Sequence, residues 1–415
     1  MRRPGGRTTG IAAWADPYHR DMDDTRRDWD AIVVGLGAIG SAAAYWTSRS
    51  LGDRVLGLER FELDHVNGAS ADHSRIIRLS YHRPDYVRLS KRAHAAWAEV
   101  EAASGDRIVT TTGGLDLWPA DPAIPMVDYT DSLTAEGVPF ELLDGAEVRR
   151  RWPQWRLDDG VTAMWQRDGG LADPFRGNAA HRRLARANGA TLRERSPVTA
   201  IRDAGGGDLE VVTATATYRT GRLMVAADAW TNDLLASFDR RLPLTVTKEQ
   251  VTYFDCPDPA AFAPERFPVW IWMDEPCYYG FPTYGEAGPK AAQDCGGGPV
   301  DPDARTFERD EAAFARVAAF MAAHLPGAIG PPIYTKTCLY TLTPDRDLVV
   351  DRLPEAPGVV VALGAAHGFK FASVLGRILA EMCLDGETPS APDLEWFRID
   401  RPILLEADPA TSWMV

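Results

Sequence analysis

A glycine-rich turn between a short apolar strand and an alanine-rich helix constrains the fold more than any other feature of this sequence. The apolar run 31–34 (AIVV) predicts a buried strand, the spacing GxGxxG follows it, and a helix is expected over 41–50. Glycines at these positions permit a tight turn, let backbone N–H groups approach a pyrophosphate and allow close packing of helix on strand. We therefore expect a dinucleotide to contact Gly35, Gly37, Ala38, Ile39 and Gly40.

A second strand, expected over 55–59, ends in an acid that strengthens this interpretation. Glu59 lies 24 positions after Gly35, close to the spacing at which a carboxylate binds a ribose diol, and Arg60 follows it directly. The acid argues against NADP, whose 2′-phosphate it would repel, but the motif does not separate FAD from NAD. A glycine-rich helix that packs closely for its own sake is the other reading of this motif.

The rest of the chain alternates between two kinds of sequence pattern. Its length of 415 residues is too great for a single ordinary hydrophobic core and indicates two domains. Apolar residues recur at helical spacing through 85–103, and Asp173-Pro174 is typical of the start of a helix that Gly189 ends. Prolines and aromatic residues dominate about 243–337. A strand is expected again from 359, followed by a helix that stops near Gly386. We predict an α/β (α+β) protein of two domains that follow a mobile leader over 1–28. The first is a Rossmann-like, discontinuous dinucleotide-binding domain over 29–110, 174–240 and 340–402. The second is an antiparallel-sheet substrate domain over 111–173 and 241–339.

Charge and cysteine content narrow the range of partners. A formal net charge of −14 and a pI near 5.1 argue against nucleic acid or an anionic membrane surface as partner. No uncharged apolar run approaches the roughly 20 residues of a membrane helix. Five scattered cysteines form no CxxC pair or regular disulfide framework, which fits a reducing, cytoplasmic setting, and the eight histidines show no metal-binding spacing. We expect a monomer that binds a small molecule and no metal.

Three further segments resemble the monomeric sarcosine oxidase and N-methyltryptophan oxidase family of amine oxidases. The first is 67–78 (NGASADHSRIIR), which is similar to the family segment that ends in Arg-Ile-Ile-Arg beside the flavin. The second is 278–282 (YYGFP), with Lys290 a few residues further on. The third joins 336–341 (KTCLYT) to 367–371 (HGFKF). The resemblance implies that the dinucleotide is FAD and that the first domain is an FAD-binding domain.

The resemblance also implies that Cys338 carries FAD through a thioether. From the residues alone, Cys338 lies in an alternating, strand-like run beside Lys336, and a neighbouring cation would favour the thiolate needed for attachment. Without the resemblance, an inert buried cysteine would be the simpler reading. Further cofactor contacts that the resemblance implies are Ser74, Arg75, Gly364, His367, Gly368, Phe369 and Lys370.

Catalytic roles follow from the same resemblance. Arg78 and Lys370 match the pair of cations that hold the substrate carboxylate, as a guanidinium and an ammonium can do when they converge on one anion. Lys290 matches the lysine that activates oxygen near the flavin N5, and Arg75 matches an arginine near the flavin face. From the residues alone, these cations could equally be solvated or ion-paired. Tyr279 and Tyr340 match residues that line the substrate cavity, although either could be core packing.

The chain departs from the family pattern at several of these positions. Ser70 and Ala71 stand where the family often has paired histidines, which puts the corresponding flavin contacts in doubt. Asp294 replaces a histidine and adds a negative charge that makes sarcosine itself a poorer candidate. Asp228 replaces a glycine in a turn near the dinucleotide, and the sequence offers no account of it beyond the tolerance of Asp for a left-handed backbone.

Aromatic residues in 270–284 bear on the size of the substrate. Trp270 and Trp272 should face one side of a strand and, with the tyrosines that follow, would make the substrate layer strongly aromatic. A larger amine would fit such a layer, whereas ordinary core packing is the alternative of equal weight.

The resemblance therefore implies an FAD-dependent oxidase of the C–N bond of a secondary amine or an N-substituted or cyclic amino acid. Such an enzyme yields an imine, then a carbonyl and an amine, and passes electrons to molecular oxygen to give hydrogen peroxide. A flavin dehydrogenase with another electron acceptor and a catalytically idle flavin-binding protein remain alternatives. An NAD-dependent dehydrogenase would leave Cys338 and 367–370 without a role.

Overall fold

The computed structural model describes residues 27–412, so the expected leader at 1–28 lies outside the described part except for its last two residues. A six-stranded sheet in the order β19-β20-β13-β1-β2-β9 forms one half of the molecule. Its strands pair in parallel from β20 to β9, and β19 joins in the antiparallel sense. The strands are β1 (Ala31–Val34), β2 (Val55–Leu58), β9 (Thr191–Arg193), β13 (Leu223–Val225), β19 (Val349–Arg352) and β20 (Val359–Leu363).

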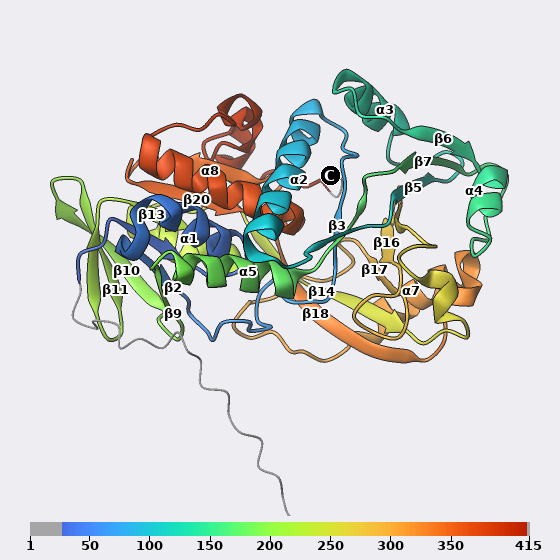
Figure 1. The fold of residues 1–415 in the computed structure, drawn as a ribbon, viewed down its shortest axis with the longest axis horizontal. Coiled ribbons are helices and arrows are strands. Elements are labelled where there is room, and N and C mark those ends of the chain that lie inside the picture. The colour runs from blue at the N-terminus through green and yellow to red at the C-terminus, as the bar shows by residue number, and fades with distance from the viewer. Residues whose placement is uncertain (1–26, 413–415) are drawn as a thin grey trace, which may run out of the picture.

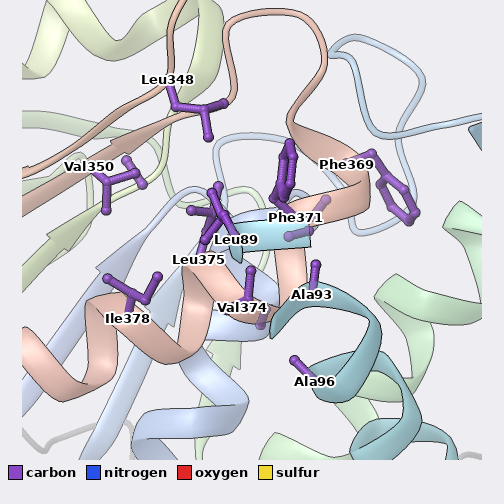
Figure 2. Close-up of a cluster of buried hydrophobic side chains, with 14 of the residues drawn as sticks. Leu89, Ala93, Ala96, Leu348, Val350, Phe369, Phe371, Val374, Leu375 and Ile378 are labelled. Atoms are coloured by element: carbon purple, nitrogen blue, oxygen red, sulfur yellow. The ribbon is translucent and has the colours of Figure 1, made fainter. Parts of the chain in front are cut away.

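Four long helices pack in this half. Helix α1 contacts α8 and α5, and α2 also contacts α8. A Cβ atom added to Gly376 in α8 would lie 2.4 Å from the Ala42 side chain of α1, so small residues set the close approach of these two helices. Figure 2 shows Leu375 of α8, Leu89 of α2 and Val350 of β19 in the buried cluster between them. The helices are α1 (Ala38–Leu51), α2 (Pro84–Ser104), α5 (Pro174–Ala187) and α8 (Ala372–Asp385).

An eight-stranded sheet in the order β18-β14-β17-β16-β15-β5-β7-β6 lies beside the first (Figure 1). Strands β14 and β18 form its longest pair and run antiparallel from Thr245↔Leu342 to Phe254↔Pro332. The sheet is mixed because β15 pairs with β5 in parallel. Its strands are β5 (Gly114–Trp118), β6 (Glu141–Asp144), β7 (Thr162–Gln166), β14 (Thr245–Phe254), β15 (Val269–Trp272), β16 (Tyr278–Phe281), β17 (Lys290–Gln293) and β18 (Pro332–Leu342).

The packing of the eight-stranded sheet decides between the two interpretations of its aromatic residues, in favour of core packing. Trp270 and Trp272 do share one side, but that side packs on α7 (Glu311–His324) through Phe320. Tyr278 stacks on the same Phe320 ring with centroids 4.3 Å apart. These aromatic residues are core, so they give no support for a large substrate.

Local signals set several element ends where they were expected. The Asp173 side chain accepts a hydrogen bond of 3.0 Å from the Arg176 amide at the start of α5. Helix α8 ends at Gly386, whose φ of +84° suits glycine. The remaining strands are β3 (Arg75–Ile77), β4 (Val109–Thr111), β8 (Gly170–Ala172), β10 (Val198–Gly205), β11 (Asp208–Thr213) and β12 (Thr217–Thr220), and the remaining α-helices of the described chain are α3 (Met126–Ala135), α4 (Gly145–Arg151) and α6 (Thr231–Leu235). Within residues 27–412, no helix is both long and apolar enough to cross a membrane.

Candidate active site

The glycine-rich turn after β1 forms a cradle that excludes side chains. A Cβ atom on Gly35 would lie 2.4 Å from the Ala226 carbonyl oxygen, and one on Gly40 would lie 1.7 Å from the Gly35 oxygen. Gly35 also has φ of +86°. The first turn of α1, residues 38–41, contains no acid, and its first amide, that of Ala38, donates a 3.0 Å hydrogen bond to the Ser70 hydroxyl oxygen. The positive end of the helix dipole therefore points into this cradle, where it would stabilise a bound anion.

Glu59 lies beside this turn, at the end of β2. It is buried, and its carboxylate accepts hydrogen bonds from the Leu36 amide at 2.7 Å and the Phe61 amide at 3.0 Å. Burial alone would raise the pKa of Glu59, but His65 and these two amides bring it below its usual value. Glu59 is thus an anion held at the mouth of the cradle.

Two cavities meet at the turn and together form one long trough. The first is lined by Glu59 and Arg60, and the second by Arg78 and Lys370. The walls that both cavities share are Gly37, Ala69, Ser70, Ala226 and Asp228. The predicted contacts on the second cavity are Ala38, Ile39, Ser74, Arg75, Lys290, Tyr279, Cys338, Tyr340, Gly364, His367, Gly368 and Phe369. Of the predicted site residues, only Gly40 lines neither cavity, because it packs on Gly35 instead.

Cys338 lies on β18, in the wall of the second cavity. It is buried and pairs in register with Glu249 of β14. Burial raises the pKa of the Cys338 thiol to about 11, and Arg75 is the cation that opposes this rise most strongly. Lys336 does interact with the Cys338 thiol, since Cys338 opposes the fall that burial causes in the pKa of Lys336, but burial and Arg75 act on Cys338 more strongly.

A buried ion-pair cluster forms the wall near Cys338. Lys290 Nζ lies 3.0 Å from Asp72 Oδ2 and donates a 2.7 Å hydrogen bond to the Ser74 carbonyl oxygen. Arg75 Nη1 lies 2.9 Å from the same Asp72 oxygen. Lys290 is therefore a cavity residue and not the solvated loop lysine that its sequence neighbours allowed.

Two further cations of the second cavity converge on one aromatic ring. Arg78 Cζ lies 4.7 Å and Lys370 Nζ lies 5.7 Å from the centre of the Tyr81 ring. Arg78 Nη1 is buried and has no hydrogen-bond partner among residues 27–412, and its closest ion-pair contact is Asp116 at 3.9 Å. Burial, and then the charge of Arg78, lower the pKa of Lys370 well below its usual value. An anion bound here would satisfy both cations.

Asp294 forms an ion pair instead of presenting a free charge. Its Oδ2 atom accepts a hydrogen bond of 2.8 Å from Nη1 of the buried Arg346. Asp294 thus brings the predicted negative charge to the cavity wall, but Arg346, which lines the same cavity, offsets it, so the pair adds little net charge. The objection to sarcosine that rested on this charge is removed.

Asp228 stands at the junction of the two cavities in the backbone shape that its sequence allowed. Its φ is +47°, in the left-handed region. Its Oδ2 atom is buried without a hydrogen-bond partner in the described chain. Burial raises the pKa of this carboxyl to about 6, against smaller opposite effects of the Thr341 hydroxyl and the Ala229 amide.

The remaining lining of the second cavity is mainly apolar. Ile271 and Met273 lie on and after β15, on the face opposite Trp270 and Trp272, and Ile124 lies before α3. Tyr279 and Tyr340 both line this cavity, and their hydroxyl groups share a hydrogen bond of 3.3 Å.

Comparison with known proteins identifies this arrangement. Residues 30–382 match the family described as DAO, FAD dependent oxidoreductase. The chain therefore belongs to the family of FAD dependent oxidoreductases.

Individual relatives narrow the assignment. The monomeric sarcosine oxidase of Streptomyces avermitilis is 37% identical over 380 residues, which cover 87% of this chain and 94% of that protein. The N-methyl-L-tryptophan oxidase of Yersinia pestis is 30% identical and covers 90% of this chain and 99% of its own. The structure of NikD, an amino acid oxidase of nikkomycin biosynthesis, aligns with a TM-score of 0.77 at 27% identity, over 88% of this chain and 95% of that one. Within the family, the chain belongs with the monomeric sarcosine oxidases and N-methyltryptophan oxidases.

The trough fits the cofactor of this family. Glu59 is placed to accept hydrogen bonds from a ribose, and the side-chain-free turn at Gly35 and Gly37 leaves room for a pyrophosphate at the α1 N-terminus. Arg75 and Cys338 would then lie beside the flavin end, because both line the second cavity.

Sequence reasoning missed three polar residues of this site. Asp72, Asp116 and Arg346 each pair with a predicted site residue, namely Lys290, Arg78 and Asp294. Only Asp72 had a usable local signal, since it precedes Arg75 by three positions. The other contacts join distant segments and have no counterpart in the sequence pattern.

Proposed function

We propose that this chain is an FAD-dependent amine oxidase that acts on the C–N bond of a secondary amine, or an N-substituted or cyclic amino acid, bearing a carboxylate. The observation that carries this proposal is the pair of cations beside Tyr81. Arg78 offers a buried nitrogen without a hydrogen-bond partner in the described chain, and Lys370 shares its cavity. A guanidinium and an ammonium can bind one carboxylate jointly through charge-assisted hydrogen bonds.

This clamp would fix the substrate relative to the cofactor. With the carboxylate on Arg78 and Lys370, the carbon next to nitrogen is restricted to the space between the clamp and Cys338, which line one cavity. FAD, when bound, supplies a ring that accepts a hydride from that carbon. The product imine is hydrolysed to a carbonyl compound and an amine, or persists when it is cyclic. Apolar Ile124, Ile271 and Met273 would hold the substrate side chain.

We further propose that FAD is joined to Cys338 and that oxygen is the electron acceptor. Cys338 lines the flavin end of the trough, and Arg75 offsets part of the effect of burial on its thiol. Lys290 presents a buried cation in the same cavity, where it would stabilise superoxide as oxygen accepts its first electron. Hydrogen peroxide is then the reduced product.

A monomeric, cytoplasmic enzyme is also part of the proposal. All five cysteines are free in the structure, as expected in a reducing compartment. The names of the relatives suggest sarcosine, N-methyl-tryptophan and other N-substituted amino acids as the first substrates to assay.

The test is to denature purified protein with acid and to record the visible spectrum and mass of the polypeptide. Yellow colour and added FAD mass should stay with the native chain and with Cys256→Ala, a buried-cysteine control outside the cavity, and should be lost in Cys338→Ala. Flavin released from the native chain would exclude attachment. Anaerobic bleaching of the flavin by a carboxylated secondary amine, then peroxide release in air, is expected, and a flavin that stays oxidised with every such amine would refute amine oxidation.

A further inference from the structure

A buried carboxylate joins two cations of the site. The Asp72 side chain is 2% exposed, and its Oδ2 atom lies 3.0 Å from Lys290 Nζ and 2.9 Å from Arg75 Nη1. Its other oxygen accepts hydrogen bonds of 2.7 Å from the Tyr253 hydroxyl and the His73 amide. Burial would raise the pKa of Asp72, but Lys290 and Arg75 keep it well below its usual value. Asp72 is thus an anion that is fixed from several sides.

The other surroundings of Lys290 disfavour its charge. Its side chain is 1% exposed, and Nζ lies 3.8 Å from the centre of the Phe281 ring. Burial lowers the pKa of Lys290 to about 8; Asp72 opposes this fall, and Arg75 adds to it. The titratable and charged groups that face the ammonium are Asp72 and Arg75 from segment 67–78, Tyr253 from β14, and Cys338 from β18, with Lys336 of β18 acting on Asp72. Asp72 is the one acidic side chain in this set.

We propose that Asp72 is a positioning residue for reoxidation of the cofactor: its carboxylate keeps the Lys290 ammonium protonated and holds it in the cavity wall. This inference rests on the role proposed for Lys290. In reoxidation, the reduced cofactor gives two electrons and one proton to oxygen, solvent gives the second proton, and hydrogen peroxide leaves. Lys290 keeps its own proton throughout, since its contribution is the electric field of a fixed cation.

The experiment compares the rates at which reduced wild type, Asp72→Asn and Lys290→Met react with oxygen in a stopped-flow instrument, from pH 5.5 to 10. The cofactor is reduced anaerobically by light, so the test does not depend on which amine is the substrate. At pH 7 a lysine with a pKa of about 8 is roughly 90% protonated. An adjacent opposite charge shifts a pKa by ~1–3 units, so loss of about two units would leave roughly 10% protonated. The rate at pH 7 should therefore fall about tenfold, and the pH at which activity declines should move from near 8 to below 7.

Three controls separate this effect from general damage. Asp72→Glu retains the negative charge, so its reoxidation rate should again decline near pH 8. In a Lys290→Met background, Asp72→Asn should cause no further change in the pH profile, because it acts through the lysine. The visible absorption of the oxidised cofactor, titrated without turnover, should show the same displaced midpoint. Asp72→Ser, which is smaller and neutral, replaces Asp72→Asn if the latter does not fold.

Two results would overturn the inference. In the first, the reoxidation rate of the wild type declines near pH 8, Lys290→Met abolishes this decline, and Asp72→Asn leaves it in place. This result would overturn the role of Asp72 alone. In the second, the reoxidation rate of the wild type shows no decline with pH and is no higher than that of Lys290→Met. This result would overturn the proposed role of Lys290, and this inference with it.

Discussion

The clearest energetic consequence of the site concerns Asp228, whose carboxyl group is buried at the junction of the two cavities. Its pKa is about 6 in the folded protein against 3.8 for an unperturbed Asp. Because the folded-state pKa is raised, the folded protein binds this proton more tightly than the unfolded chain does. Stability is therefore greatest below pH 3.8 and is lost as the pH rises through 6. At 1.36 kcal/mol for each pKa unit, the raised pKa of Asp228 lowers the unfolding free energy by about 3 kcal/mol at pH 8 and by about 1 kcal/mol at pH 4.5, relative to a side chain that does not ionise.

Asp228→Asn isolates this charge. Asn keeps the size of the side chain and tolerates the left-handed backbone, so the variant should exceed wild type in unfolding free energy by about 3 kcal/mol at pH 8 and by about 1 kcal/mol at pH 4.5. Urea unfolding of the flavin-free protein, followed by tryptophan fluorescence, measures both differences.

The chain offers a matched control for this measurement. Asp239 also has a left-handed backbone, with φ of +54°, but is exposed, so Asp239→Asn should change stability by no more than about 0.5 kcal/mol at either pH. An Asp228→Asn difference that is the same at pH 4.5 and pH 8 would refute the reasoning, because strain or lost packing does not titrate.

Two further predictions concern binding. Glu59→Gln, in a Cys338→Ala background that leaves the cofactor exchangeable, should raise the dissociation constant of FAD about tenfold, because one charge-assisted hydrogen bond of roughly 1.5 kcal/mol to the ribose is weakened. Titration of the flavin fluorescence measures this, and an unchanged constant would remove Glu59 from the FAD site. Arg78→Gln should weaken a small carboxylate inhibitor by roughly 30-fold or more, through loss of about 2 kcal/mol of charged hydrogen bonding. Perturbation of the flavin spectrum reports this binding, and equal affinities in variant and wild type would contradict the carboxylate clamp.

The parts of the fold that the sequence predicted well are those fixed by neighbouring residues. The turn at Gly35, the cap at Asp173 and the stop at Gly386 each depend on a few adjacent positions, and the structure has all three. Alternation also placed Trp270 and Trp272 correctly on one side of β15. It could not show which layer covers that side, since α7 lies some forty positions further along the chain.

The errors at the site have one physical origin. Lys290 and Asp72 are 218 positions apart, and Arg346 and Asp294 are 52 positions apart, so neither ion pair leaves a periodic signal in the sequence. The charge of Asp294 could be read from the sequence, but its neutralisation by Arg346 could not. In the same way, burial of Cys338 outweighs the nearby cation that the sequence showed, because burial is set by the whole fold.

The order of strands in the six-stranded sheet has a consequence for how the protein is made. The two neighbours of β13 are far apart in the sequence: β1 begins at residue 31, whereas β20 ends at residue 363. A ribosome releases these segments one after the other, so the glycine turn emerges long before β20 and the 364–370 wall that faces it. The cavity beside Gly35 and Glu59 needs only residues up to 234, whereas the cavity that would hold the flavin end also needs residues 338–370. Chains that terminate before residue 338 would therefore lack the flavin end of the trough, so we expect complete loading late in biogenesis.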